Sequence, residues 1–155
     1  MLRERGFTVI ELLVVMAVMA ILAMASFPLA ELHVQREREA ELKRALWEIR
    51  DAIDAYKRAA DAGEISKPAG GSGYPRTLES LVAGEASIKD STRRLYFLRR
   101  VPRDPFADPA LPPERTWGLR SYQSPPERPR AGEDVYDVYS LAEGQGLSGV
   151  PLREW

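Results

Sequence analysis

Glu11 is the residue of this sequence whose chemistry is hardest to explain as ordinary structure. It is the only acid in an apolar run that opens at Phe7, and nineteen uncharged residues follow it from Leu12 to Ala30. An ionised carboxylate within a membrane helix costs about 3 kcal/mol even on the mildest insertion scales. The sequence has no cation on the apolar side of Glu11, so this acid needs a partner that the intact chain does not supply.

A cut between Gly6 and Phe7 would supply that partner. Residues 1–6 are a short polar start that contains Arg3 and Arg5, and the apolar run begins directly after them. Cleavage would create an α-amino group with an ordinary pKa of about 8. This amine would lie one helical turn from Glu11 of the same chain, or beside Glu11 of a neighbouring copy.

The apolar run has the dimensions of a membrane anchor. As a helix, Leu12–Ala30 would be about 28 Å long at 1.5 Å per residue, close to the hydrocarbon thickness of a bilayer. Arg3 and Arg5 precede it, so the positive-inside rule leaves the N-terminus in the cytoplasm and the chain after Ala30 outside. Pro28 removes one backbone donor and is expected to kink this helix.

The chain then becomes polar but keeps a helical period. One apolar stripe recurs at steps of four and three: Leu42, Leu46, Ile49, Ile53, Tyr56 and Ala60. The charged residues between these positions form a solvated face of mixed sign. Gly63 is expected to end the helix as its C-terminal cap.

The remainder predicts a small α+β domain. Residues 68–75 form a loop, and Thr77 is expected to cap a short helix that reaches Val82. A second helical stretch is expected over residues 91–99. Residues 117–122 and 135–141 are rich in aromatic and β-branched residues and predict strands. The fold class is therefore α+β, with a long N-terminal helix packed on a small antiparallel sheet.

The N-terminal stretch Arg5-Gly6-Phe7-Thr8-Val9-Ile10-Glu11 resembles the start of the type IV pilin-like superfamily. The resemblance implies that a prepilin peptidase cuts after Gly6 and N-methylates Phe7. It also implies that Glu11 contacts the N-terminal amine of an adjacent subunit during filament assembly, and that a helix proline such as Pro28 is usual. The expected architecture is pilin-like.

Three later segments resemble the major pseudopilins of type II secretion systems, so the resemblance extends over nearly the whole chain. These segments are residues 74–81, 98–106 and 136–140. The implied function is that of a structural subunit of a periplasmic filament that drives protein export, not that of an enzyme. Many adhesive pilins close a C-terminal loop with a disulfide, and this chain has no cysteine. A major or minor pilin of a type IV pilus remains the alternative.

This interpretation divides the chain into four parts. Residues 1–6 are a cleaved leader, 7–30 the transmembrane and filament-core helix, 31–62 its amphipathic continuation, and 63–155 a periplasmic globular domain. The expected location is the inner membrane, with a single span, and the periplasm after assembly. The implied partners are further copies of the chain, minor pseudopilins, the prepilin peptidase, the inner-membrane assembly platform and membrane lipid. The net charge of −1 and the absence of a basic block argue against nucleic acid as a partner.

An ordinary signal peptide is the main competing interpretation. Ala23-Met24-Ala25 precedes Ser26 as a small-x-small cleavage site, which would release a soluble exported protein beginning at Ser26. Catalytic chemistry has less support, because the chain has one histidine, His33, and no cysteine. Residues 144–149 match a dinucleotide fingerprint, but too few residues follow for the helix that such a motif needs, so a loop is expected. Asp134 and Asp137 could imitate a glycosidase pair.

No cofactor is required, but the resemblance implies that calcium could bind in the loop after the last strand. Calcium needs six to eight oxygen ligands. The candidate ligands here are Asp137 and Glu143, and the late aspartates of the family's loop are absent. We therefore expect the loop to be held by burial of apolar side chains instead of by an ion. These side chains are Leu147, Val150, Leu152 and Trp155.

Overall fold

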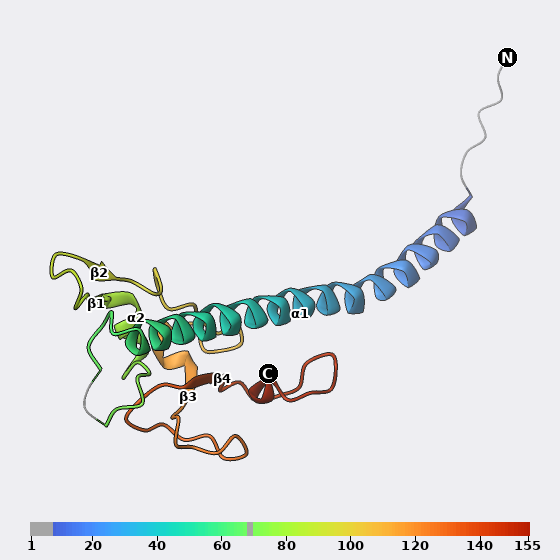
Figure 1. The fold of residues 1–155 in the computed structure, drawn as a ribbon. Helices are drawn as coiled ribbons and strands as arrows, with labels where there is room; N and C mark the ends of the chain where they lie inside the picture. The colour runs from blue at the N-terminus through green and yellow to red at the C-terminus, as the bar shows by residue number, and fades with distance from the viewer. Residues whose placement is uncertain (1–7, 68–69) are drawn as a thin grey trace. The chain divides into compact units, whose positions relative to one another are not determined.

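The computed structural model describes residues 8–67 and 70–155, and the side chains of residues 25–30 lie outside the description. Its elements in chain order are α1 (Val9–Asp61), α2 (Leu78–Ala83), β1 (Glu85–Ala86), β2 (Arg94–Leu95), η1 (Pro113–Thr116), β3 (Trp117–Arg120), β4 (Asp137–Ser140) and η2 (Leu152–Glu154). The chain divides into two compact units, Met1–Glu37 and Arg38–Trp155. The fold is α+β and pilin-like, with a long N-terminal helix and small antiparallel sheets, as predicted (Figure 1).

The first unit contributes the beginning of α1. Helix α1 continues through Pro28 without a break. Among the described residues, no stretch of helix is both long and apolar enough to cross a bilayer. Part of the predicted anchor, residues 7–30, lies outside the description. Phe7 is not described, and neither are the side chains of residues 25–30, which include Pro28. The anchor and the proline kink therefore stay predictions.

The second unit has its core on one face of α1. All six residues of the predicted apolar stripe are buried, and Leu42, Ile49 and Ile53 have no exposed surface. Each fully buried Leu or Ile side chain contributes about 2 kcal/mol to folding. The alanines between them on α1, Ala45, Ala52 and Ala59, are buried as well. The other members of this core are Ala45, Ala52, Ala59, Ile65, Leu78, Leu81, Leu98, Val101, Trp117, Val135, Val138 and Leu152.

Gly63 ends α1, as the sequence predicted. Its φ of +65° lies in the left-handed region that glycine adopts without strain. Gly63 N–H donates to the carbonyl of Ala60 at 3.1 Å, and Glu64 N–H donates to that of Ala59 at 2.9 Å. These two bonds are the Schellman arrangement, which satisfies carbonyls left open at a helix end.

The prediction of a helix over residues 91–99 is wrong. β2 pairs antiparallel with β1, with Glu85 opposite Leu95. Asp90 starts a turn, because its carboxylate accepts bonds from both the amide and the hydroxyl of Thr92. Phe97 and Leu98 donate their amides to the carbonyl of Leu81. The backbone amides of this segment thus bond to other segments of the chain instead of to each other. These tertiary contacts outweigh the helical propensity of its residues.

The helix predicted after Thr77 is present as α2, but Thr77 does not cap it through its side chain. Instead, the Ser80 hydroxyl donates to the Thr77 carbonyl at 2.7 Å. The two predicted C-terminal strands form as β3 and β4, which pair antiparallel from Trp117 opposite Ser140 to Arg120 opposite Asp137. β1–β2 and β3–β4 are separate two-stranded sheets instead of the single sheet expected.

Candidate functional site

The first turn of α1 positions Glu11. Helical hydrogen bonding starts at Thr8, whose carbonyl accepts the amides of Glu11 at 3.1 Å and Leu12 at 3.2 Å. The Thr8 hydroxyl oxygen also accepts the Glu11 amide at 3.3 Å. Glu11 therefore occupies the third position of the helix, within the first turn, where the helix dipole favours negative charge.

Thr8 and Glu11 have the spacing of a capping box, which the sequence interpretation missed. In such a box a Ser or Thr caps the third helical amide while a Glu or Gln at that third position bonds back to the cap residue. The Thr-x-x-Glu pattern before an apolar run was the available signal. The bond from the Glu11 amide to the Thr8 hydroxyl is one half of such a box. Capping is therefore an alternative to subunit docking as the role of the Glu11 side chain. The two roles differ in one respect, because a Gln can serve a capping box but carries no charge.

The helix around Glu11 presents apolar side chains on all sides. The large apolar residues described between Val9 and Met24 are between 50% and 79% exposed. They are Val9, Ile10, Leu12, Leu13, Val14, Val15, Met16, Val18, Met19, Ile21, Leu22 and Met24. Contiguous apolar surface of this extent marks a contact with a membrane or with protein.

Residues 1–27 match the family model described as the prokaryotic N-terminal methylation motif. The chain carries a type IV pilin-like prepilin signal. This signal implies processing by a prepilin peptidase and pilus-like assembly, and the proteins that carry it are structural subunits. The matched stretch includes Gly6, Phe7 and Glu11. No curated protein and no solved structure matches the chain.

The candidate cleavage point between Gly6 and Phe7 falls within the matched signal. Both residues lie outside the part of the chain that the structure describes. Thr8 is the first described residue, and the helix begins at Val9. Cleavage and N-methylation therefore stay predictions. The single histidine, His33, lies on the surface of α1, where its Nε2 is 3.3 Å from the carboxylate of Glu37.

Of the two calcium candidates, Asp137 is already bonded to other side chains. Arg50 Nε donates to Asp137 Oδ1 at 2.8 Å, and Arg120 Nη2 donates to Asp137 Oδ2 at 3.4 Å. The Glu143 side chain is exposed to solvent. In the described part of the chain, no three residues with His, Cys, Asp or Glu side chains are grouped to hold a metal. Since both oxygens of Asp137 already bond to guanidinium groups, the described side chains do not fit a calcium ion.

The loop after β4 is fastened to α1 by polar contacts and by part of the expected apolar set. The buried carboxylate of Glu39 accepts the amide of Leu147 at 2.7 Å. Lys43 Nζ lies 4.5 Å from the centre of a Trp155 ring. Arg50 Nη2 donates to the Trp155 carbonyl at 2.8 Å. We call Glu39, Lys43 and Arg50 the clasp.

The prediction of apolar closure was right for only part of this loop. Leu152 is buried and Trp155 is half-buried, whereas Leu147 and Val150 are 44% and 41% exposed. Gly146 lies against the Trp155 ring, and a Cβ at this position would lie 2.3 Å from it. The glycine-rich stretch 144–149 is a loop, as expected, and a bridge between Gln145 and Pro151 closes it. The clasp supplies the attachment that Leu147 and Val150 were expected to give.

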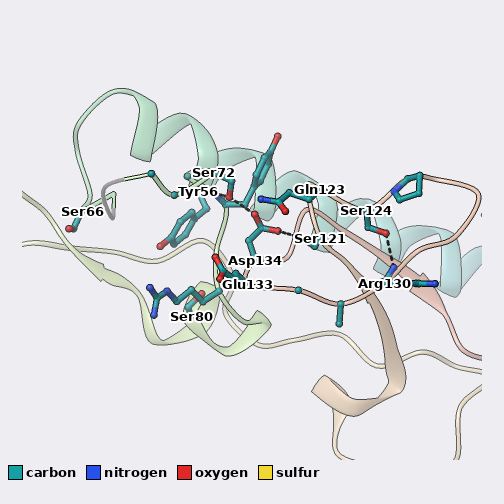
Figure 2. Close-up of a pocket in the computed structure, with 18 of the residues that line it drawn as sticks. Tyr56, Ser66, Ser72, Ser80, Ser121, Gln123, Ser124, Arg130, Glu133 and Asp134 are labelled. Atoms are coloured by element: carbon teal, nitrogen blue, oxygen red, sulfur yellow. Dashed lines mark hydrogen bonds between the residues drawn. The ribbon is translucent and has the colours of Figure 1, made fainter.

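A cavity of about 1020 Å³ lies between the loops that precede α2 and β4 (Figure 2). Asp134 forms part of its wall. Its carboxylate accepts bonds from the Ser72 hydroxyl, from the Ser121 hydroxyl at 2.7 Å and from the Tyr122 amide at 2.9 Å. Partial burial opposes ionisation, but the bonds from Ser72, Tyr122 and Ser121 outweigh it and hold the pKa of Asp134 below its ordinary value.

The contacts of Asp134 fit a structural clamp. The hydroxyls of Ser72 and Ser121 both donate to this carboxylate. Ser72 lies 62 residues and Ser121 lies 13 residues before Asp134, so the carboxylate connects two separate loops. His33 does not line the cavity. Asp137 bonds to Arg50 and Arg120, so the two aspartates have different partners. The arrangement gives no support to the glycosidase-like pair considered from the sequence.

Asp104 is a second structural acid, and the sequence interpretation did not single it out. It is fully buried. Its Oδ1 accepts the amide of Phe106 at 2.8 Å, and its Oδ2 accepts the Ser140 hydroxyl at 2.5 Å. Asp104 therefore connects the proline-rich segment to the end of β4. The Asp-Pro dipeptide at 104–105 was the available signal, since Asp side chains form such turns with the backbone two residues on.

Proposed function

We propose that this chain is a structural subunit of a type II secretion pseudopilus, assembled from the inner membrane into a helical filament that drives protein export. The prepilin signal at residues 1–27 carries the proposal. The exposed apolar surface of α1, with Glu11 in its first turn, supports it. The α+β pilin-like fold is in accord with it.

In this proposal the chain has four parts. A prepilin peptidase removes residues 1–6, and residues 7–30 anchor the subunit in the inner membrane with a single span before they pack in the filament core. Residues 31–62 continue the helix, and residues 63–155 form a globular domain in the periplasm. Further partners are minor pseudopilins and the inner-membrane assembly platform. The chain has no catalytic role.

Charge explains how Glu11 would act. In a filament core of apolar helices, van der Waals packing competes with lipid of similar polarity, so the bulk affinity between helices is modest. A carboxylate opposite the new α-amino group of Phe7 in an adjacent subunit supplies a specific attraction at one position. Glu11 then fixes the register of the incoming subunit, and the apolar side chains of α1 supply the contact area between subunits.

The absence of cysteine favours a pseudopilin over an adhesive pilin. Without a disulfide, an adhesive pilin would need another way to hold its C-terminal loop. In this chain the clasp holds that loop with contacts inside one subunit. A type IV pilus subunit is the alternative that the same signal allows. Deletion of the protein in its host separates the two, because a pseudopilin is required for export of folded proteins and a pilin for surface fibres.

N-terminal sequencing and intact mass of the membrane-extracted protein test the proposal. We expect a mature chain that starts at Phe7 and carries one methyl group on its α-amine. Gly6→Leu should leave the precursor uncut, because the peptidase must closely accommodate the residue before the scissile bond. Ala25→Leu is the matched control and should be processed normally. A mature chain that starts at Ser26, lost in Ala25→Leu, would contradict the proposal and support an ordinary signal peptide.

A further inference from the structure

The cavity beside Asp134 is built from segments that lie far apart in the sequence. The loop before α2 and the segment between β3 and β4 form most of its wall, and Tyr56, Ser80 and Glu85 add to it (Figure 2). Its volume of about 1020 Å³ has room for a small molecule, since sites for such ligands measure about 300–1,000 Å³. We call it the Asp134 cavity.

Three arginines in this wall have guanidinium groups that the fold does not use. They are Arg76, Arg128 and Arg130, and all three residues are exposed. Within the described chain, their guanidinium groups form no hydrogen bond and no ion pair. A guanidinium has five N–H donors in a plane and can bind a carboxylate through two of them. These donors are therefore free to bind a carboxylate that another molecule brings.

The backbone of Arg128 and Arg130 is bonded to the segment that follows β3. The Arg130 carbonyl accepts the Ser121 amide at 2.9 Å, and the Arg130 amide donates to Ser124 Oγ at 2.8 Å. The Ser124 hydroxyl donates to the Arg128 carbonyl at 3.0 Å. The fold therefore holds both residues at the cavity before any ligand arrives, which lowers the cost of ordering them on binding.

The acids of the wall restrict the kind of anion that fits. Among the described residues the cavity is lined by Glu85, Glu133 and Asp134, so its acids are as many as its arginines. Asp134 accepts three hydrogen bonds, and Glu85 accepts the Tyr56 hydroxyl at 3.4 Å. A highly charged anion would be repelled by these carboxylates. A ligand with one carboxylate and several neutral polar groups fits the balance of charges better.

Neutral hydrogen-bonding groups complete the wall. The hydroxyls of Ser80 and Ser121 donate inside the protein, and their oxygens keep lone pairs that can accept from a ligand hydroxyl. The exposed Gln123 amide forms no hydrogen bond within the described chain and offers both donors and an acceptor. Guanidinium donors beside several neutral donors and acceptors match a molecule that carries a carboxylate among hydroxyl and amide groups.

We propose that the Asp134 cavity binds an acidic saccharide. Arg76, Arg128 and Arg130 provide the donors for its carboxylate, while the serine oxygens and the Gln123 amide bond to its hydroxyl groups. The source of the ligand rests on the proposed function, because a domain outside the inner membrane meets the acidic amino sugars of the cell wall. The binding chemistry itself does not depend on filament assembly.

A matched pair of disaccharides tests the carboxylate. N-acetylglucosaminyl-N-acetylmuramic acid and diacetylchitobiose share the same amino-sugar backbone, and only the first carries a lactyl carboxylate. Titration calorimetry of the full-length chain, in a detergent without a sugar head group, should show about tenfold tighter binding of the acidic disaccharide. Equal affinity for the two disaccharides, or no binding of either, would overturn the proposal.

Arginine substitutions test the site. The double variant Arg128→Gln/Arg130→Gln should bind the acidic disaccharide about tenfold more weakly, with no change for the neutral one. Arg99→Gln/Arg100→Gln is the matched control, since both arginines are exposed and neither lines the cavity. Equal melting temperatures of the two double variants would exclude misfolding. Wild-type affinity in the first variant would remove the arginines from the site and overturn the proposal.

Other anions test the class of ligand. Inorganic phosphate that displaces the acidic disaccharide at an equal concentration would show that the cavity responds to charge alone, and would overturn the saccharide. Tighter binding of triglutamate than of the disaccharide would assign the cavity to an acidic peptide, with the same consequence. Weak competition by both anions would support the saccharide.

The outcomes separate this inference from the proposed function. A chain that is cut after Gly6 and forms filaments, but binds neither disaccharide, would overturn the saccharide site and leave the pseudopilin proposal standing. A mature chain that starts at Ser26 and still binds the acidic disaccharide would overturn the pseudopilin proposal and leave the site standing.

Discussion

Arg50 donates a hydrogen bond of 2.8 Å from Nη2 to the carbonyl of Trp155, a residue 105 positions later in the sequence. The same guanidinium donates to Asp137 Oδ1 at 2.8 Å and to the Val138 carbonyl at 3.1 Å. One side chain on α1 thus holds both β4 and the segment after it. A planar group with five donors can do this where a lysine ammonium cannot, because its donors have fixed directions.

The first prediction concerns this contact. Arg50→Met keeps the length of the side chain but removes all three bonds, and we expect it to lower the free energy of unfolding by about 2–3 kcal/mol. For a chain of this size the melting temperature should fall by about 5–10 °C. Arg44→Met is the matched control, since Arg44 is exposed on the same helix, and it should change stability by less than about 0.5 kcal/mol. Equal melting temperatures of the two detergent-extracted variants would contradict the role given to Arg50.

The second prediction concerns the buried carboxylate of Asp104. Asp104→Ala leaves the Phe106 amide and the Ser140 hydroxyl without their acceptor in a buried position, which should cost about 2–4 kcal/mol. Chemical denaturation of the full-length chain in detergent measures the loss. Asp108→Ala is a suitable control, because Asp108 is exposed in the same proline-rich segment and should have a smaller effect. If both variants lose the same stability, the connection between this segment and β4 is not important for folding.

The third prediction concerns calcium. Because Asp137 is occupied by Arg50 and Arg120 and Glu143 is exposed, addition of calcium or of a chelator should leave the melting temperature of the full-length chain unchanged within repeat error. An ion that binds only the folded state would raise the melting temperature in proportion to its concentration relative to its Kd. A calcium-dependent rise that disappears in Glu143→Ala would show that the loop holds an ion after all.

The fourth prediction concerns the pH dependence that Asp134 contributes. Its pKa is lower in the folded chain than the ordinary value of 3.8. A group of this kind adds stability that is fully present above its unfolded pKa and is lost as the pH falls through its folded pKa. Asp134→Asn should therefore be less stable than the wild type at pH 7, and the difference should shrink as the pH falls below about 3.8. Denaturant unfolding between pH 7 and pH 3 measures both curves.

Glu133→Gln provides the control for that experiment, since the Glu133 side chain is exposed beside Asp134. Its stability should differ little from that of the wild type across the same pH range. A gap between wild type and Asp134→Asn that widens in acid would reverse the expected sign. It would mean that the three bonds to Asp134 do not favour its ionised form.

The fifth prediction separates the two roles of Glu11. Glu11→Val should block filament assembly without harming membrane insertion, because removal of the carboxylate makes the helix more apolar. Glu11→Gln is the discriminating variant, since Gln can serve a capping box with Thr8 but cannot attract a cationic amine. We expect Gln to fail like Val in a shearing assay, while both accumulate in the membrane fraction. Normal filaments from Glu11→Gln would assign Glu11 to helix capping and remove its role in docking.

The sequence alone was sufficient for the features that depend on local pattern. The apolar stripe from Leu42 to Ala60 predicted the buried face of α1, because a helix repeats its direction every 3.6 residues whatever it packs against. Gly63 predicted the helix end, because few other residues adopt a positive φ without strain. The prepilin signal was also readable, since Gly6, Phe7 and Glu11 lie within one short segment, and residues 1–27 match the corresponding motif.

Only the tertiary structure decided the features that depend on distant partners. Residues 91–99 have a helical composition, but pairing with Glu85–Ala86 and with the Leu81 carbonyl uses their backbone donors. Arg50 looked like one charge among many on a solvated face until the fold brought Trp155 to it. The type of a residue shows that its side chain can donate a hydrogen bond or be buried. Its partner, however, can lie about a hundred residues away and is brought close only when the intervening chain folds, so a local sequence pattern does not predict it. For the same reason Leu147 and Val150, which were apolar enough to be buried, stay exposed once the clasp holds their loop.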